Sequence, residues 1–183
     1  MPYRARNHSA VVVNYHGLLN PSKVPIEEKF SLDMLAVERA LGNPMNQLCG
    51  ASVLLDFKEF NLWKMLALTP QVARMYVEFL QNSFPLRLKS IICLNTPTIF
   101  SLLFNIIYPL LSKKLRSRLM VHSINEGWEN LHAVLPPEIL PEAYGGKIKK
   151  SSLIDLCERI EDHEEYFQRH LDYGFIKSKH HHD

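Results

Sequence analysis

The sequence predicts an α/β fold in which a mixed, largely parallel sheet is flanked by helices. Short runs of apolar and β-branched residues, at 10–16, 51–57 and 90–94, have the length and composition of strands. Amphipathic stretches separate them, and this alternation is typical of parallel sheets. The chain has 183 residues, of which 46% are hydrophobic and 22% charged. It is therefore long enough for one globular domain whose core needs no disulfide or metal.

The first three elements follow from local composition. Residues 10–16 (AVVVNYH) are β-branched and aromatic, which favours a strand. Residues 26–41 are expected to form an amphipathic helix that ends at Gly42. Residues 51–57 (ASVLLDF) are a continuous apolar run, as expected for a strand buried on both faces. The apolar side chains of the helix recur at helical spacing, at Phe30, Met34, Val37 and Leu41.

The middle of the chain is expected to contain a second amphipathic helix, a third strand and an apolar helix. Residues 70–84 form the second helix, with Thr69 as its N-cap and a proline in the first position. Residues 90–94 (SIICL) are the third strand. Residues 98–111 (TIFSLLFNIIYPLL) are the apolar helix, which Pro109 breaks.

The last third of the chain is more polar. We expect a basic continuation at 113–118, a fourth strand at 119–121, a short helix at 124–134, a turn-rich segment at 135–146 and a long, acidic helix at 150–171. These elements predict a main domain over residues 3–148, a C-terminal helical extension packed on it over 149–173, and a loose tail over 174–183.

Charge and cysteine usage limit the partners and the compartment. The net charge of +2 is too weak to argue for nucleic acid. Cys49, Cys93 and Cys157 lie far apart without a CxxC, which indicates free thiols in a reducing compartment. No signal-peptide pattern follows the basic start. The apolar run at 98–111 has 14 residues, whereas a bilayer-spanning helix needs roughly 20. We therefore expect a cytoplasmic protein without a transmembrane span.

The motifs of common enzymes are absent from the sequence. There is no GxSxG nucleophile elbow, and no GxGxxG follows a predicted strand. The segment from Tyr144 to Lys147 lacks the first glycine and the Ser/Thr of a Walker loop. Asp56 and Glu59 are candidates for an acid pair, but a carboxylate at a strand end is more often a cap or turn residue. The sequence therefore predicts a protein that is not an enzyme and needs no cofactor.

Histidines offer three candidate metal or catalytic sites, each with a simpler explanation. His163 and His170 lie on one face of the predicted acidic helix, where a solvated charged face is the more common arrangement. The three histidines at 180–182 lie in the expected loose tail. His122 has no nucleophile placed beside it by any motif, so a hydrogen-bonded core histidine is the better interpretation. We predict no metal site.

An apolar helix next to a basic run is the most informative feature of the sequence. Four of the six residues at 113–118 (KKLRSR) are cationic, and they follow the apolar helix at 98–111 directly. Interfacial membrane docking requires this combination, because apolar atoms enter the acyl boundary while cations meet anionic headgroups. A core helix followed by a solvated turn has the same pattern, and periodicity alone favours it.

Residues 50–146 carry an ordered set of motifs that resembles the CRAL-TRIO lipid-binding domain. The motifs are GASVLLDF from Gly50, LTP from Leu68, NSFPLRLK from Asn82, LNTP from Leu94, YPLL from Tyr108 and LPEAYGG from Leu140. Their order and spacing together are specific. Within the family, the sequence is most similar to the branch of tocopherol-transfer and retinaldehyde-binding proteins. The resemblance extends more loosely from about residue 3 to about residue 167.

The resemblance implies a sheet that forms the floor of an apolar lipid pocket, which a lid helix closes and opens at membranes. The implied pocket walls are Val37, Leu55, Tyr76, Phe79, Phe84, Leu86, Leu88 and Ile91. The implied lid residues are Phe100, Leu103, Phe104, Ile107, Leu110 and Leu111. Without the family, all of these residues are equally consistent with an ordinary core.

The resemblance also implies a phosphoinositide headgroup site, and it shows where this sequence departs from its family. The matching headgroup residues are all basic: Arg87, Lys89, Lys114 and Arg118. Because the chain starts close to its first predicted strand, we expect it to lack the small helical domain that normally precedes the lipid-binding domain in this family. Asp33 stands where the tocopherol branch has a small polar residue facing the pocket. A carboxylate there disfavours an entirely apolar ligand unless it is paired.

Two functions from different classes remain open at this stage. The first is a carrier that binds and transfers a small hydrophobic lipid, of the tocopherol or retinoid kind, and docks transiently to membranes containing phosphatidylinositol bisphosphate. The second is an adaptor or regulatory module of the same fold that no longer carries lipid and binds a protein partner at residues 154–167. The identity of the lipid, the oligomeric state and the pathway cannot be predicted from the sequence.

Overall fold

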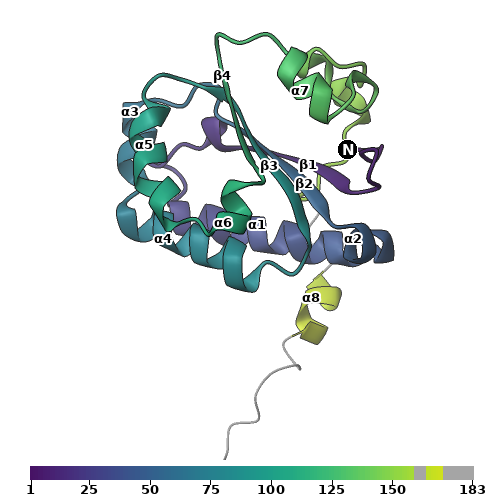
Figure 1. Ribbon diagram of the computed structural model, residues 1–183. Coiled ribbons are helices and arrows are strands. Elements are labelled where there is room, and N and C mark those ends of the chain that lie inside the picture. The colour runs from purple at the N-terminus through teal and green to yellow at the C-terminus, as the bar shows by residue number, and fades with distance from the viewer. Residues whose placement is uncertain (159–163, 171–183) are drawn as a thin grey trace, which may run out of the picture.

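A four-stranded parallel sheet lies at the centre of the computed structural model, which describes residues 1–158 and 164–170 (Figure 1). Its strands are β1 (Ala10–Tyr15), β2 (Ala51–Asp56), β3 (Leu88–Thr96) and β4 (Leu119–Ser123). They are hydrogen-bonded in the order β1-β2-β3-β4, and every described pairing is parallel. The sheet confirms the predicted α/β fold class.

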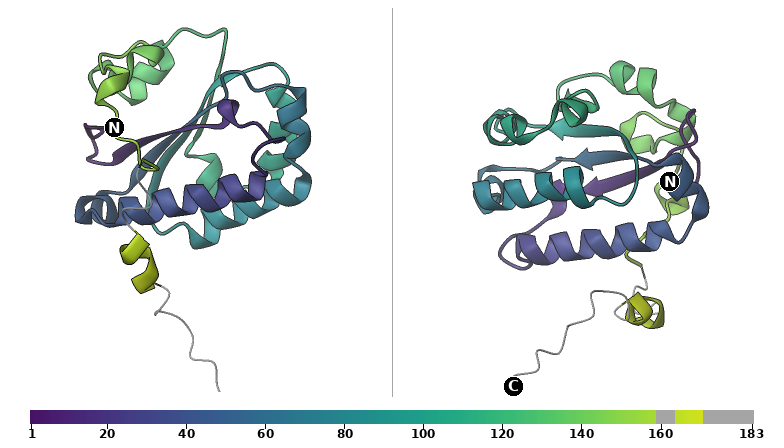
Figure 2. Two further views of the ribbon diagram at one scale, coloured as in Figure 1. Left: turned by 180° about the vertical axis from the view of Figure 1, so that it is seen from behind. Right: turned by 60° about the horizontal axis from the view of Figure 1, so that its bottom comes forward.

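The strand order determines where the helices lie. Each strand pairs with the next one along the chain, and parallel crossovers are right-handed, so all three connections lie on the same face of the sheet. Figure 2 shows these helices gathered on one side and α7 (Glu129–Val134) on the other. The crossover helices are α1 (Ile26–Leu41) and α2 (Pro44–Cys49), α3 (Leu62–Ala67) and α4 (Pro70–Glu78), and α5 (Phe100–Ile107) and α6 (Lys113–Arg116).

Alternation along the strands divides the core between the two faces of the sheet. On the α7 face, Leu54, Ile92 and Leu94 are fully buried with Leu140 and Tyr144. On the crossover face, Leu55 and Cys93 pack with Phe57 and Phe100, and Ile91 packs with Leu111, Leu115 and Val77. The crossover helices are therefore held to the sheet by apolar burial rather than by helix propensity alone.

Short polar side chains start several of the helices. The Thr69 hydroxyl accepts a hydrogen bond from the Val72 backbone N–H at 3.3 Å, as predicted for the N-cap of α4. Asn43 and Asn61 do the same for α2 and α3, two short helices that the sequence analysis missed. At its end, α4 widens into a π-helical turn over Phe79–Ser83.

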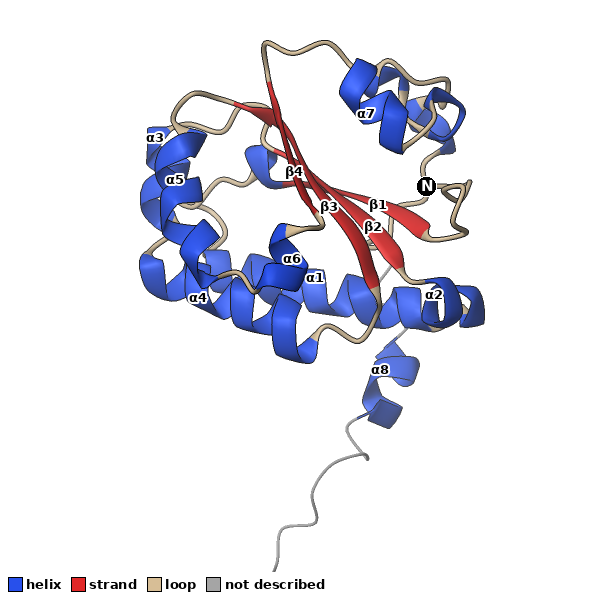
Figure 3. Ribbon diagram, viewed as in Figure 1, coloured by secondary structure: helices blue, strands red, loops and turns tan. Residues whose placement is uncertain are grey.

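The structure corrects two predicted helices and refines the bounds of a third. The apolar helix expected at 98–111 is α5 followed by a 3₁₀ turn at Tyr108–Leu110, where Pro109 ends the α-helical ladder. The helix expected at 124–134 begins only at Glu129. The acidic helix expected at 150–171 was wrong as a continuous element, because residues 153–158 are not helical (Figure 3). Helix α8 (Glu164–His170) occupies part of its place. His163 and the tail at 174–183 lie outside the described residues.

Candidate functional site

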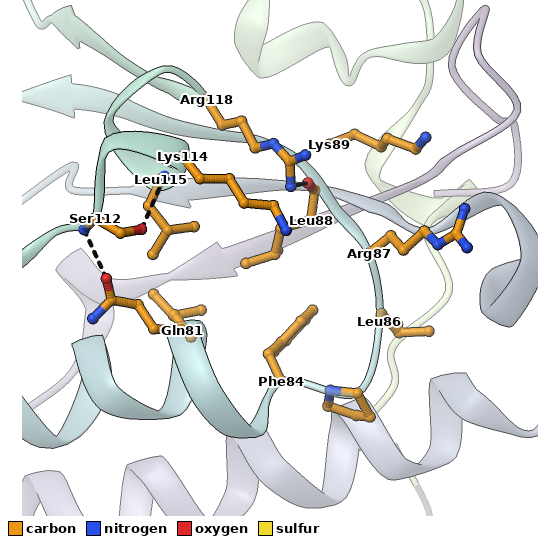
Figure 4. A pocket seen from close by; sticks show the side chains of 12 residues that line it. Gln81, Phe84, Leu86, Arg87, Leu88, Lys89, Ser112, Lys114, Leu115 and Arg118 are labelled. Atoms are coloured by element: carbon orange, nitrogen blue, oxygen red, sulfur yellow. Dashed lines mark hydrogen bonds between the residues drawn. The ribbon is translucent and has the colours of Figure 1, made fainter.

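A pocket of about 540 Å³ opens at the amino end of β3, where the π-helical turn, the start of β3 and α6 meet (Figure 4). The twelve residues that line it are Leu80, Gln81, Phe84, Pro85, Leu86, Arg87, Leu88, Lys89, Ser112, Lys114, Leu115 and Arg118. They include all four of the cations that the resemblance marks as a headgroup site. The sequence could indicate their positive charge, and the fold brings them to one opening.

The four cations approach the pocket from two sides. Arg87 and Lys89 come from the segment that enters β3, whereas Lys114 lies on α6 and Arg118 precedes β4. In Figure 4, Lys114 extends from α6 toward the Leu88 side of the pocket. Arg118 donates a hydrogen bond to the backbone carbonyl of Leu88, which ties the two sides together.

Three of these cations have no partner within the described part of the chain. The side chains of Arg87, Lys89 and Lys114 are exposed there and make neither an ion pair nor a hydrogen bond. Clustered positive charge without a carboxylate nearby attracts an anion. The pocket can therefore bind an anion without first breaking an internal ion pair at these three side chains.

A glycine sets the position of Arg87. Gly50 enters β2 with φ of +77°, and a Cβ atom at this position would lie 2.1 Å from the backbone oxygen of Arg87. The next residue, Ala51, donates its N–H to the same oxygen at 2.9 Å. Only glycine combines this positive φ with so close an approach. The start of β3, and Arg87 with it, is thereby fixed against β2.

The floor of the pocket is apolar. Leu86, Leu88 and Leu115 are buried, and Phe84 is half-buried beside Pro85. The resemblance assigned Phe84, Leu86 and Leu88 to the lipid pocket, and the structure places them beneath the cations. An apolar floor under a cationic rim suits an amphipathic ligand.

Gln81 joins the pocket wall to the segment that follows α5. Its Oε1 accepts a hydrogen bond from the Ser112 backbone N–H at 2.7 Å, and its Nε2 donates to the Leu110 carbonyl at 3.4 Å. Arg116 holds the same segment from the other side, donating to the carbonyls of Leu111 and Pro109 at 2.9 and 3.1 Å. The sequence analysis missed Gln81, because no motif marks it.

Helix α5, which the sequence analysis assigned as a lid, is closed onto the sheet in this structure. Phe100 and Leu103 are buried against Phe57 and Cys93, and Leu111 is buried in the neighbouring cluster around Ile91. The remaining lid residues, Phe104, Ile107 and Leu110, are half-buried. Movement of α5 stays a prediction.

The other expected pocket walls lie between the sheet and the helices. Ile91 is buried, whereas Val37, Leu55, Tyr76 and Phe79 are only half-buried although they lie in this layer. A run of ring contacts crosses it, with centroid separations from 4.8 to 6.2 Å: Phe57–His16, His16–Tyr76, Tyr76–Phe30, Phe30–Phe79 and Phe79–Phe84. Aromatic packing therefore extends from the α5 cluster to the basic pocket, where Phe84 lies.

A polar cluster interrupts this aromatic layer. Lys29 and Asp33, four residues apart on α1, form an ion pair. Asn14 on β1 donates to Asp33 Oδ1 at 2.9 Å and accepts from Lys29 Nζ at 3.0 Å. The Asp33 carboxylate is thus paired, which is the condition under which the sequence analysis allowed it beside an apolar ligand. Burial, reinforced by the positive charge of Lys29, lowers the pKa of the neighbouring His16 to about 4, so this ring is neutral at pH 7.

The carboxyl end of the sheet holds a structural network. Asp56 is buried and accepts hydrogen bonds from Asn95 Nδ2 at 2.7 Å, the Lys58 N–H at 2.8 Å and the Tyr144 hydroxyl at 2.7 Å. Glu59 is exposed with φ of +68°, a turn conformation. Asp56 and Glu59 are therefore structural cap and turn residues, which is the interpretation that the sequence analysis favoured over an acid pair.

His122 is a core histidine, as its interpretation from sequence favoured. The residue is 1% exposed, its Nε2 lies 2.7 Å from the Gly127 carbonyl, and its ring stacks on Trp128 at 4.8 Å. Among the residues that the structure describes, no three His, Cys, Asp or Glu side chains gather as a metal site would require.

Large apolar side chains are exposed on the outer sides of α3 and α5. Trp63 and Leu66 on α3 are each 62% exposed, and Leu102 on α5 is 53% exposed. Their inner neighbours Met65 and Phe104 pack into one shared cluster, so the two helices lie together. In the parts of the chain that the structure covers, no helix has the length and apolar character to cross a bilayer.

Together, the four-stranded parallel sheet, the crossover helices on one of its faces and the basic pocket at the amino end of β3 describe an α/β domain. The model of the CRAL/TRIO domain family matches residues 1–146, so the chain belongs to this family. The membership confirms the resemblance seen in the sequence motifs.

Curated relatives include the Homo sapiens "Alpha-tocopherol transfer protein-like", which is 35% identical over 126 residues, covering 69% of this chain and 36% of that protein. Clavesin-2 from Homo sapiens is 32% identical over 131 residues, covering 72% and 39%. The chain thus spans less than half the length of these relatives. The crystal structure of Sfh5 matches with a TM-score of 0.58 at 19% identity, covering 88% of this chain and 58% of that one, and shows the shared fold.

Proposed function

We propose that this chain is a non-enzymatic carrier that binds and transfers a small hydrophobic lipid and docks to phosphoinositide-containing membranes. The observation that carries the proposal is the basic pocket, whose lining includes Arg87, Lys89, Lys114 and Arg118. One relative bears the name of a transfer protein for alpha-tocopherol, and this supports lipid as the cargo.

The electrostatics of the pocket suit a phosphorylated headgroup. Arginine contacts phosphate through two parallel N–H groups, whereas lysine acts as a point charge, and the pocket offers both types. Each cation near an anionic membrane contributes about 1 kcal/mol to binding. The three cations without a partner in the described part of the chain therefore supply a useful affinity, and the apolar floor accommodates the apolar part of the lipid next to its headgroup.

The exposed apolar side chains support membrane contact. Soluble proteins rarely expose several large apolar residues together unless they form an interaction surface. Trp63, Leu66 and Leu102 project from helices that pack against each other, and α6 with Lys114 follows α5 directly. In this proposal the apolar side chains enter the acyl boundary while the cations meet headgroups.

The lipid would lie between the sheet and the crossover helices, among the half-buried residues Val37, Leu55, Tyr76 and Phe79. Helix α5 would be the lid over this site. Catalysis is not part of the proposal. The carboxyl edge of an open α/β sheet is the usual place for an active site, and here the buried Asp56 is held there by three internal hydrogen bonds.

Liposome binding tests the headgroup part of the proposal. Binding to vesicles of phosphatidylcholine with and without phosphatidylinositol bisphosphate is measured for the wild type and for a variant with alanine at Arg87, Lys89, Lys114 and Arg118. A charge-matched control replaces four exposed cations away from the pocket, Arg6, Lys23, Lys58 and Lys149. We expect the phosphoinositide-dependent gain to vanish only in the pocket variant. Equal binding by all three proteins would contradict the headgroup site.

The alternative is the adaptor function. The ion pair of Lys29 and Asp33 favours it, because an entirely apolar lipid gains nothing from an ion pair beside its binding site. In that case the segment from Ile154 to Phe167 would bind a protein partner. Ile154 is exposed, and Arg39 on α1 holds the backbone carbonyls of Leu156 and Glu158 at 3.0 and 2.7 Å. A stoichiometric lipid that co-purifies with the protein would argue against this alternative.

A further inference from the structure

The outer edge of β4 carries backbone groups that have no hydrogen-bond partner in the described part of the chain. β4 is the last strand in the order β1-β2-β3-β4, so it pairs on one side only (Figure 3). The Arg118 carbonyl accepts from the Ile91 N–H at 2.8 Å, which turns the even-numbered residues of this segment toward β3. Because backbone groups alternate along a strand, the N–H and C=O groups of Leu119 and Val121 point away from β3.

Nothing in the sequence of β4 protects this edge. Residues 119–123 (LMVHS) contain no proline and no Lys, Arg, Asp or Glu, which are the residues that commonly keep an edge strand from pairing. Val121 is 39% exposed, and Ile124, directly after the strand, is 52% exposed. The opposite edge is partly covered, because the Met1 amine donates to the Val11 carbonyl on β1 at 3.0 Å. β4 is therefore the edge to which another strand can add.

The two ends of β4 carry opposite charge. The segment before the strand, 113–118 (KKLRSR), has four cations, whereas both charged residues in the segment after it, 124–129 (INEGWE), are acidic. Lys113, Glu126 and Glu129 are exposed. A strand of the same polarity that pairs antiparallel places its acidic end beside the basic end of β4, whereas parallel pairing would place like charges together. A second copy of this chain supplies such a strand.

We propose that two copies of this chain associate through antiparallel pairing of their β4 strands, about a two-fold axis at Val121. Each copy contributes the same edge, so the contact closes on itself. Val121 then lies opposite Val121 of the partner subunit, and Leu119 lies opposite Ser123 of the partner subunit. Opposed residues exchange N–H···O=C bonds in pairs, and the two sheets become one. The proposal does not depend on whether the chain carries lipid.

Sedimentation velocity of the full chain, without added lipid, tests the association. The edge is short, so the dimer belongs to the class of weak, concentration-dependent interfaces. We expect the average mass to rise from the monomer value of 21.2 kDa toward twice that value as the protein concentration increases. The concentration should be varied from about 5 to 500 µM, because a small interface gives micromolar rather than nanomolar affinity.

Two substitutions at Val121 test whether β4 forms the contact. Val121→Pro removes an N–H that points away from β3, so it breaks no hydrogen bond of the monomer. Val121→Lys adds a charge that two opposed edges cannot both bury. Each should weaken dimerisation by about tenfold or more. Val134→Lys, at a 44% exposed position on α7, is the matched control and should change nothing. Circular dichroism and melting temperature establish that each variant is folded.

Disulfide trapping tests the register. Cys49 and Cys157 are first replaced by serine, whereas the buried Cys93 is kept. Val121→Cys should then cross-link to a second copy, because the Cα atoms of such opposed residues lie about 5.5 Å apart. Ser123→Cys should not cross-link to itself, because the residue opposite it is Leu119.

The outcomes decide the proposal in either direction. A folded wild type that stays monomeric over the whole concentration range would overturn it, and this is the result expected if a strand of another protein covers the edge. A dimer that persists unchanged in Val121→Lys would overturn it as well. Equal cross-linking of Ser123→Cys and Val121→Cys would contradict the antiparallel register. If Val121→Pro does not fold, Val121→Lys and the cross-links decide the question.

Discussion

Replacing Tyr144 by phenylalanine should destabilise the protein, whereas the same replacement at the exposed Tyr3 should not. The Tyr144 hydroxyl donates to Asp56 Oδ2 at 2.7 Å, and the Tyr144 side chain is 1% exposed. The other contacts of this carboxylate, with Asn95 and Lys58, end on Oδ1. Tyr144→Phe therefore removes a bond to a buried carboxylate oxygen. Tyr3→Phe, by contrast, changes a residue that is 59% exposed.

The expected magnitudes follow from these contacts. A hydrogen bond to a charged group contributes about 1.5–3 kcal/mol, so Tyr144→Phe should lower the free energy of unfolding by about 2 kcal/mol. For a chain of this size, that loss corresponds to a fall of about 4–8 °C in melting temperature. Tyr3→Phe should leave the free energy of unfolding within about 0.5 kcal/mol of the wild-type value.

Urea unfolding, followed by tryptophan fluorescence and circular dichroism, measures both variants on delipidated protein at pH 7. Unchanged m-values are needed for the comparison, because a changed slope would mean that the unfolded state differs. If both substitutions cost the same free energy, or if Tyr144→Phe costs nothing, the stabilising role of the Tyr144–Asp56 hydrogen bond is refuted.

Three further predictions concern single side chains. Lys114→Ala should weaken binding to phosphoinositide vesicles, measured by co-sedimentation, about fivefold, and added salt should reduce this difference. Lys58→Ala should have no effect in this assay. Burial raises the pKa of Cys93 to about 12. A thiol reagent at pH 8 should therefore label the exposed Cys157 and react with Cys93 only after unfolding. Rapid labelling of Cys93 in the native state would contradict its burial. Burial lowers the pKa of His16 to about 4, so the unfolded state binds more protons than the folded state between pH 4 and 6.5. The free energy of unfolding should therefore be at its full value above pH 6.5 and fall by up to about 3 kcal/mol toward pH 4. His16→Gln should flatten this part of the stability curve, and an unchanged curve would refute the assignment.

Much of the fold could be predicted because strong local patterns agree with the tertiary structure. The helix at Ile26–Leu41 has the predicted bounds, and all four strands lie where apolar runs indicated them. Helices α2 and α3 were missed because six residues are too few to show a helical period. The helix expected at 150–171 was inferred from its acidic residues, and charge without an apolar stripe does not hold a helix to a core.

The candidate site could be predicted only in part. The sequence identifies four basic residues, Arg87, Lys89, Lys114 and Arg118. Their position around one pocket depends on how α6 packs against the start of β3. Spacing of four residues could have indicated the Lys29–Asp33 ion pair. The contact of this pair with Asn14 on β1 could not be predicted, because it depends on how α1 crosses the sheet.

The polar cluster under α1 is the feature that most distinguishes this chain from a simple apolar container. It places charge, an amide and a phenol beside residues expected to line the lipid. In a module that no longer carries lipid, these groups would be structural. In a carrier they would define the chemistry of the ligand, and the two situations differ in whether a lipid is bound at all.

The most direct test of the carrier function is native mass spectrometry of the purified full chain after incubation with a cell lipid extract. The proposal predicts a single added mass at one lipid per protein, and its fragmentation identifies the lipid class. A folded protein that takes up no lipid from the extract would contradict the carrier function and favour the adaptor.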